Sequence, residues 1–215
     1  MLELGFKVFL SYLCGSLNGA LLVGQLYGGV DIRKVGSGNA GGTNALRTQG
    51  KLFAFLVLTI DIAKGVIPVL VLPGMSWPFG IDSEISRNWV TFACGGAAIF
   101  GHCYPVWFQF AGGKGAATTL GVLAAIAAPL ILPTALIWIS VLLIFGYVGL
   151  ATVLAAASVP VFVILQGSDA EQFDLLIFVT MVAAFVAYTH RSNLRRLLRG
   201  ESKPDIRFRL LRRSG

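Results

Sequence analysis

The sequence predicts an all-α, polytopic helical membrane protein with about seven transmembrane helices, and three observations support this fold class. The 215 residues are 56% hydrophobic and only 13% charged, and their mean hydropathy of +0.78 is well above that of soluble domains of this length. Apolar runs of about 20 residues, the length that crosses a bilayer core, recur along the chain. The segments between them alternate between basic and acidic. We expect one transmembrane domain over residues 1–200 and a basic cytoplasmic tail over 201–215.

The apolar runs and the residues that break them place the expected helices. The N-terminus lacks the positive region of a cleaved signal peptide, so its apolar run is interpreted as a retained first helix. Pro129, Pro133, Gly146 and Gly149 interrupt a nearly continuous apolar stretch, so the boundaries of the fourth to sixth helices stay open. The expected helices cover residues 3–27, 52–73, 88–108, 116–132, 133–149, 151–167 and 172–190.

The distribution of charge predicts the orientation of the chain in the membrane. Lysine and arginine accumulate in short cytoplasmic loops, and here they gather in 31–51, at Lys114 and after His190. The intervening segments are acidic, with Asp82 and Glu84 in one and Asp169, Glu171 and Asp174 in the other. Seven helices with a periplasmic N-terminus and a cytoplasmic C-terminus satisfy this pattern in a bacterial inner membrane. The net charge of +7 then reflects topology and attraction to anionic membrane lipids, and we expect no nucleic-acid partner.

The three cysteines, Cys14, Cys94 and Cys103, have no C-x-x-C spacing and fall in or beside expected helices. They are interpreted as small packing residues. We therefore predict no metal site and no cofactor.

The first of three polar segments that carry chemistry runs from Gly36 to Arg47. Its glycines match a dinucleotide-binding fingerprint in spacing, but that motif requires a strand before it, and membrane helices flank this segment. Glycines let backbone amides approach an anion, and an arginine adds a charged planar fork. A flexible loop with turn and cap residues is the alternative. The candidate phosphate-binding residues are Ser37, Gly38, Asn39, Thr43, Asn44 and Arg47.

The second segment is Gly112-Gly113-Lys114-Gly115, at the start of the fourth expected helix. It is not a Walker A loop, because the upstream glycine and the Ser or Thr after the lysine are missing. A glycine-rich turn into a helix N-terminus still offers amides, the positive end of the helix dipole and an ammonium group to an anion. Lys114 could instead be a topology charge. His102, just upstream, is equally compatible with packing at a helix end and with substrate contact.

The third segment ends the last expected helix. His190 and Asn193 are three residues apart and would share a face of a continuing helix. Nearby, Arg191, Arg195 and Arg199 form a basic stripe that is interpreted as an anchor to lipid headgroups. In the second helix, Asp61 and Lys64 have the spacing of a structural ion pair, which we favour over a substrate role.

The three segments together resemble the motifs of the bacterial membrane acyl-phosphate:glycerol-3-phosphate acyltransferases, over nearly the whole chain. The matching stretches are Ser37–Asn44, Gly112–Gly115 with the upstream Gly101, His102 and Pro105, and His190–Asn193. The chain departs from the family pattern at Gly42, Ala111, Gly149 and Glu201.

The resemblance implies an enzyme that moves a fatty acyl group from acyl phosphate to the sn-1 hydroxyl of glycerol 3-phosphate. The products would be lysophosphatidate and phosphate, at the first step of phospholipid synthesis, with the active site facing the cytoplasm and the protein functional as a monomer. The expected catalytic residues are Ser37, Lys114, His190 and Asn193. The expected substrate-binding residues are Gly38, Asn39, Thr43, Asn44, Arg47, Gly112, Gly113 and Gly115. Whether His190 is the general base or only orients a substrate stays open, because a substrate phosphate could take the proton.

Two other classes of protein fit the sequence less well. The acyltransferases with a His-x-x-x-x-Asp dyad do not fit, because Trp107 and Arg195 stand at that spacing from the two histidines. A membrane transporter of organic phosphate esters would place its binding groups near the midplane, often in paired repeats. The polar residues here are expected at one interface and no repeat is evident, so we favour the interfacial enzyme.

Overall fold

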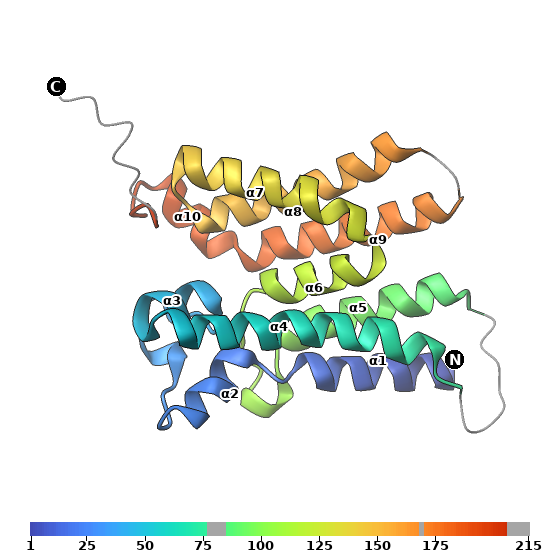
Figure 1. Ribbon diagram of the computed structural model, residues 1–215, viewed down its shortest axis with the longest axis horizontal. Helices are drawn as coiled ribbons and strands as arrows, with labels where there is room; N and C mark the ends of the chain where they lie inside the picture. The colour runs from blue at the N-terminus through green and yellow to red at the C-terminus, as the bar shows by residue number, and fades with distance from the viewer. Residues whose placement is uncertain (77–84, 168–169, 206–215) are drawn as a thin grey trace. The chain divides into compact units, whose positions relative to one another are not determined.

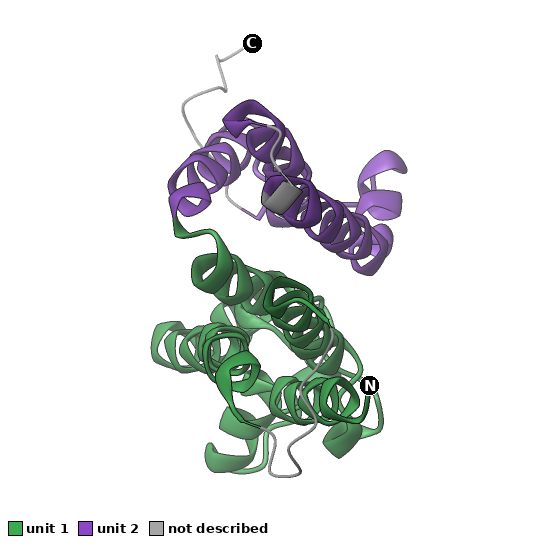
Figure 2. Ribbon diagram, turned by 90° about the vertical axis from the view of Figure 1, so that its right-hand side faces the viewer, with its two compact units in different colours: residues 1–128 green, residues 129–215 purple. Residues whose placement is uncertain are grey.

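The computed structural model describes residues 1–76, 85–167 and 170–205, and over these ranges the chain forms helices and no strand. Figure 1 shows the order of the helices along the chain. The described chain divides into two compact units, residues 1–128 and 129–215, coloured separately in Figure 2. The single domain expected over 1–200 stays a prediction, and each unit is described here by itself. The all-α prediction is confirmed for the described residues.

Unit 1 is a bundle of helices joined by two long polar connections. Helices α1 and α5 pack together, and α4 packs against α1, α2, α3, α5 and α6. The first polar connection, residues 27–50 between α2 and α4, contains η1 and α3. The second, residues 104–115 between α5 and α6, contains η3. The helices are α1 (Leu2–Gly15), α2 (Gly19–Leu26), η1 (Ile32–Lys34), α3 (Gly42–Gln49), α4 (Lys51–Val71), η2 (Leu72–Gly74), α5 (Arg87–Cys103), η3 (Val106–Phe108) and α6 (Ala116–Ile126).

The helix expected over 3–27 is broken in the structure. Helices α1 and α2 meet at an angle of 46° across residues 16–18. Asn18 is the N-cap of α2, and its side-chain oxygen accepts a hydrogen bond from the Leu21 amide at 3.2 Å. An asparagine that caps a new helix competes with continuation of the old one, so the apolar run does not form one straight helix.

Glycines allow close contacts between helices in unit 1. A Cβ at Gly15 would lie 2.2 Å from the Ala98 carbonyl oxygen, and one at Gly101 would lie 2.3 Å from that of Tyr12. The pair α4 and α6 has the same relation through Gly65 and Gly121. Small residues at helix contacts are the usual means of close packing in membranes. The backbone of α1 is thereby held against that of α5, and the backbone of α4 against that of α6.

Unit 2 consists of α7 (Ile131–Phe145), α8 (Val148–Gln166), α9 (Ala170–Thr189) and α10 (Arg191–Leu198), with η4 (Ala128–Leu130) at the boundary between the units. Helix α8 packs against α7 and α9. The chain after α10 returns to the α7–α8 turn, where the Asp205 carboxylate accepts a hydrogen bond from the Val148 amide at 2.8 Å. The Asp205 amide donates to the Gly146 carbonyl at 2.7 Å. Part of the predicted tail is therefore attached to the helical unit.

The count of membrane crossings is confirmed only in its coarser form. Within the described ranges, four helices are long and apolar enough to cross a bilayer, and the bent pair α1–α2 would make a fifth. Helix α6 has 11 residues, about 16 Å of helix, which is too short for a hydrocarbon core of about 30 Å. Seven crossings therefore stay a prediction. Several residues used to predict orientation lie outside the described residues: Asp82, Glu84, Asp169, Arg207, Arg209, Arg212 and Arg213.

Candidate active site

The first polar connection has apolar residues buried in the hydrophobic core and polar residues that are exposed. Ile32, Ala40 and Ala45 are fully buried and belong to the hydrophobic cluster that α2 and α4 form beneath them. Ser37 and Arg47 are exposed. Apolar anchors at both ends of a glycine-containing segment hold the segment in place while its polar residues remain accessible. The candidate substrate residues thus sit on a fixed base.

Asn44 shapes this connection from within. Its side-chain oxygen accepts a hydrogen bond from the Ser37 amide at 2.9 Å, and its side-chain nitrogen donates to the carbonyls of Ile32 at 3.1 Å and Val35 at 3.0 Å. The residue is 1% exposed. The structure therefore gives Asn44 a bracing role around Ser37, while the expected contact with substrate stays a prediction. Asn39, three residues before α3, and Thr43, in its first turn, are both partly buried.

The glycine-lysine segment is held by its own backbone. The Gly112 amide donates to the Cys103 carbonyl at 3.2 Å, and the Gly113 amide donates to the His102 carbonyl at 3.1 Å. These two amides, which were expected to face an anion, already have acceptors inside the protein. Donors to an anion are then more readily supplied by Lys114, which is partly buried, and by the first amides of α6, which lack intrahelical partners.

Gly113 is the point at which the two connections meet. A Cβ there would lie 2.1 Å from His102 Nε2 and 2.5 Å from the Ala40 carbonyl oxygen. No side chain fits without moving one of these neighbours. The contact places Lys114, the next residue, beside the connection that carries Ser37. Two segments about 70 residues apart in sequence are thus brought together inside unit 1.

A buried ion pair fills the break between α1 and α2. Lys64 Nζ lies 2.9 Å from Asp61 Oδ1, as the sequence predicted, and both side chains are at most 3% exposed. Lys64 also donates to the Leu17 carbonyl at 3.1 Å, and Asp61 accepts a hydrogen bond from the Gly19 amide at 3.0 Å. The cation meets the Leu17 carbonyl just after α1, and the carboxylate meets the first amide of α2, so each charge faces the helix end that complements it.

His102 is part of this buried cluster. It is 2% exposed, and its Nδ1 lies 3.3 Å from Asp61 Oδ1, within ion-pair distance but without the geometry of a hydrogen bond. Because its Nε2 edge packs against Gly113, the ring supports the glycine-lysine segment. Of the two interpretations left open by the sequence, the structure favours packing.

His190 and Asn193 belong to unit 2. His190, the residue that links α9 to α10 in the chain, is buried, and its Nδ1 lies 2.8 Å from the Val186 carbonyl oxygen. That contact requires the proton on Nδ1, so in the neutral ring Nε2 is the basic nitrogen. Asn193 lies against Gly149, at the start of α8. A Cβ added to Gly149 would be 2.6 Å from the side-chain nitrogen of Asn193. The helix is not continuous through this segment, because α9 ends at Thr189 and α10 begins at Arg191.

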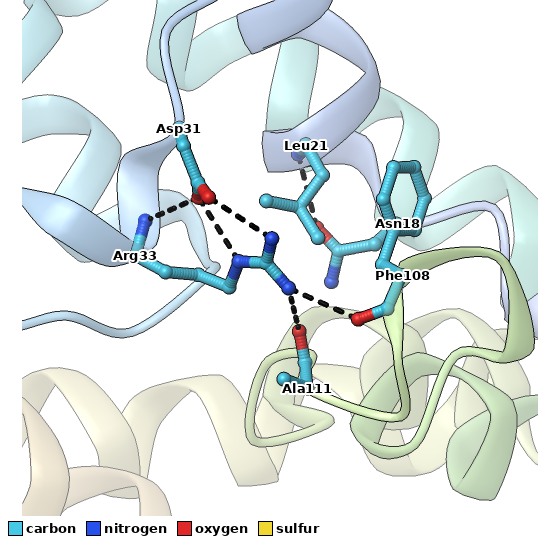
Figure 3. A network of polar contacts seen from close by, with 6 residues as sticks. All are labelled: Asn18, Leu21, Asp31, Arg33, Phe108 and Ala111. Carbon is cyan, nitrogen blue, oxygen red and sulfur yellow. Dashed lines mark hydrogen bonds and ion pairs between the residues drawn. The ribbon is translucent and has the colours of Figure 1, made fainter.

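Sequence reasoning missed the role of Asp31 and Arg33, which precede the first glycine-rich stretch. The positive charge of Arg33, which lies in the basic segment 31–51, predicted only the orientation of the chain. In the structure its guanidinium is hydrogen-bonded to Asp31 and to two carbonyls of the second connection (Figure 3). The side-chain hydrogen bond from Arg33 lowers the pKa of the Asp31 carboxyl below its ordinary value of 3.8. The signal available in the sequence was an acidic and a basic residue two positions apart, just before the glycines.

The apolar helices and the joined polar connections define a multi-pass membrane protein with a candidate site built on glycine-rich loops. The family model of glycerol-3-phosphate acyltransferase matches residues 6–200. Relatives of that name include one from Aquifex aeolicus (strain VF5), 40% identical over 91% of this chain and 95% of its own length. Another, from Methylococcus capsulatus (strain ATCC 33009 / NCIMB 11132 / Bath), is 41% identical over 89% of this chain and 90% of its own.

Solved structures give the same result. The glycerol 3-phosphate form of PlsY (YgiH), an integral membrane glycerol 3-phosphate acyltransferase, is similar with a TM-score of 0.80 and 39% identity over 94% of each chain. The lysophosphatidic acid form of PlsY gives a TM-score of 0.79 at 38% identity over the same shares. The chain belongs to the glycerol-3-phosphate acyltransferase family, as the resemblance of its motifs predicted.

Proposed function

We propose that this membrane acyltransferase moves a fatty acyl group from acyl phosphate to the sn-1 hydroxyl of glycerol 3-phosphate, the first step of phospholipid synthesis. The observation that carries the proposal is the contact at Gly113, which joins the loop of Ser37 to the loop of Lys114. Both substrates carry phosphate, and a joined pair of polar loops offers two neighbouring places for anions. The relatives' solved forms with glycerol 3-phosphate and lysophosphatidic acid support the acceptor and the product.

In the proposed reaction the sn-1 hydroxyl oxygen attacks the carbonyl carbon of acyl phosphate. The bond between that carbon and the phosphate oxygen breaks, and inorganic phosphate leaves as lysophosphatidate forms. The hydroxyl proton passes either to His190 or to a phosphate oxygen of substrate. Lys114 and Ser37 stabilise the charge that develops on the carbonyl and phosphate oxygens, where one preorganised donor contributes about 3 kcal/mol.

The remaining site residues would hold substrate or shape its surroundings. Arg47, exposed on α3, would pair with the phosphate of glycerol 3-phosphate through its planar fork. Asn39 and Thr43 would bond its hydroxyls, and Asn193 would orient the acceptor beside His190. Gly38 and Gly115, which have positive φ angles of 74° and 84°, let the backbone turn towards the anions. Gly112 and Gly113 contribute through close packing of the loop.

The proposed setting follows from charge and hydropathy. Arginines gathered on and after α10 and lysines and arginines around the two polar connections favour a cytoplasmic active site in a bacterial inner membrane. The N-terminus would then be periplasmic. The protein would act as a monomer surrounded by membrane lipids.

The donor is tested with purified protein in detergent and three donors supplied in turn: palmitoyl phosphate, palmitoyl-CoA and palmitoyl acyl carrier protein. Lysophosphatidate formed from palmitoyl phosphate alone supports the proposal, and formation from a thioester alone refutes the donor. The position of the acyl chain is read by carbon NMR of fresh product. Uptake of glycerol 3-phosphate into liposomes without any product would favour a transporter.

Site variants test the assignment of roles. Lys114→Ala and Ser37→Ala should each reduce turnover about 100- to 1,000-fold if each removes one preorganised donor. Arg199→Ala is the matched control, because it removes an exposed charge from the basic stripe and should leave turnover within about twofold. Near-wild-type rates for the first two variants would remove the proposed site. If turnover rises with pH in the wild type but not in His190→Gln, His190 is the general base.

A further inference from the structure

Asp31 holds the Arg33 side chain in one orientation within unit 1. One carboxylate oxygen accepts hydrogen bonds from the Arg33 amide at 3.0 Å and from Nε at 2.9 Å, and the other accepts from Nη2 at 2.9 Å. Asp31 is also the N-cap of η1. One edge of the guanidinium is therefore fixed by a bidentate pair, and its other edge points away from Asp31, as Figure 3 shows.

The edge of the Arg33 guanidinium that points away from Asp31 contacts the second polar connection. Arg33 Nη1 donates to the Phe108 carbonyl at 3.0 Å and to the Ala111 carbonyl at 3.2 Å. These two carbonyls flank Gln109 and Phe110, which have positive φ angles of 58° and 57°. Residues other than glycine rarely adopt this conformation, because Cβ crowds the backbone. Arg33 thus bonds both sides of a turn that is unfavourable by itself.

The turn directs the chain into the glycine-lysine loop. Ala111, the second acceptor of Arg33, is followed directly by Gly112, whose amide begins the pairing with the Cys103 carbonyl. On its own connection, Arg33 lies three residues before Gly36. A single guanidinium therefore joins the approaches to both loops, a contact separate from the packing at Gly113.

We infer that Asp31 and Arg33 form a positioning pair that sets the Ser37 loop and the Lys114 loop in register for acyl transfer. The pair acts through the two loops and touches no reacting atom. A lysine cannot replace the arginine, because its single ammonium cannot reach two carboxylate oxygens and two carbonyls at once. The inference rests on the proposed site, in which both loops hold substrate.

The test compares Arg33→Gln and Arg33→Lys with Lys34→Gln, which removes the same charge from the neighbouring exposed residue. Small misplacements of catalytic groups cost up to about 100-fold in rate. We expect kcat per folded molecule to fall about 10- to 100-fold in both Arg33 variants and to stay within about twofold for Lys34→Gln. Equal effects of Arg33→Gln and Lys34→Gln, or full activity of Arg33→Lys, would overturn the inference.

A rescue experiment separates positioning from general destabilisation. Gln109→Gly with Phe110→Gly removes the steric cost of the turn, so the turn should no longer need the hydrogen bonds from Arg33. Adding these two glycine substitutions to Arg33→Gln should therefore recover at least about fivefold in kcat. The same pair is measured in the otherwise wild-type protein as the reference. A variant that merely unfolds would lose active molecules without losing kcat per folded molecule, and glycines would not restore it.

Amide hydrogen exchange gives a readout that does not depend on the reaction. Exchange at residues 109–113 should speed up in Arg33→Gln and stay unchanged in Lys34→Gln; unchanged exchange in Arg33→Gln would refute the clamp. Wild-type turnover distinguishes the two proposals. If the wild-type protein makes no lysophosphatidate from acyl phosphate, the proposed function fails, whereas the exchange result still decides whether Arg33 holds the turn.

Discussion

Asp61→Asn tests the ion pair that fills the break between α1 and α2. The change keeps the shape of the side chain and leaves an oxygen for the Gly19 amide, but it removes the negative charge 2.9 Å from Lys64 Nζ. The ammonium stays 3% exposed, with the Leu17 carbonyl as an acceptor. Removing one partner of a buried pair costs about 3–5 kcal/mol. At about 2–4 °C per kcal/mol for a chain of this length, the melting midpoint should fall by about 6–20 °C.

The assay is thermal unfolding of the purified protein in detergent, followed by tryptophan fluorescence at a fixed scan rate. Lys64→Met and the double variant Asp61→Asn with Lys64→Met complete a double-mutant cycle. The double variant contains no unpaired charge at this position, so it should be more stable than either single variant. We expect a coupling energy of at least about 2 kcal/mol, within the range measured for residues in contact.

The reasoning would be refuted by additive effects, in which the double variant is destabilised by the sum of the single changes. It would also be refuted if Asp61→Asn melted within about 2 °C of wild type, a shift of at most about 1 kcal/mol by the same conversion. Either result would mean that the helix ends, and not the ion pair, hold the break together.

Three further predictions concern the polar connections. Gly113→Ala should reduce kcat/KM at least about 100-fold, because the new Cβ would lie 2.1 Å from His102 Nε2 and displace the loop; steady-state kinetics at several substrate concentrations check this. Asn44→Ala removes three hydrogen bonds and should destabilise the protein by about 2–4 kcal/mol, while a variant that raised only KM, with an unchanged melting midpoint, would indicate substrate contact instead. The lowered pKa of Asp31 means that its ionised form stabilises the folded chain above the ordinary value of 3.8 and that this contribution is lost as the pH falls through the folded-state pKa. Melting curves recorded from pH 6 to pH 3 should show that the wild type loses more stability on acidification than Asp31→Asn. Because the Asp31 side chain is 26% exposed, this extra loss should be at most about 1 kcal/mol. In an Arg33→Gln background, Asp31→Asn should no longer change the pH dependence.

The helices were predictable because a membrane imposes a local rule. Backbone groups in hydrocarbon must be satisfied within their own segment, so an apolar run of sufficient length becomes a helix whatever surrounds it. The expected helix over 52–73 corresponds to α4 (Lys51–Val71), and the one over 172–190 to α9 (Ala170–Thr189). The break at Asn18 was missed, because its capping hydrogen bond competes with a helix that the apolar composition also allows.

The ion pair was predictable for the same local reason. Asp61 and Lys64 lie three apart on one helix, where side chains at that spacing are neighbours. Their environment was not predictable, because the carbonyl of Leu17 and the amide of Gly19 come from another part of the chain. The sequence showed that the charges would pair, and only the folded chain showed that they face the two ends of a broken helix.

By itself the sequence determined the all-α membrane class, the family and the residues that carry its motifs, since these depend on composition and on short patterns. Only the tertiary structure decided how those residues are used. Asn44 braces Ser37, the amides of Gly112 and Gly113 bond carbonyls at the end of α5, and Arg33 joins two connections about 75 residues apart. The physical reason is that a hydrogen-bonding group takes the partner that packing brings near it, and packing between distant segments leaves no periodic trace in the chain.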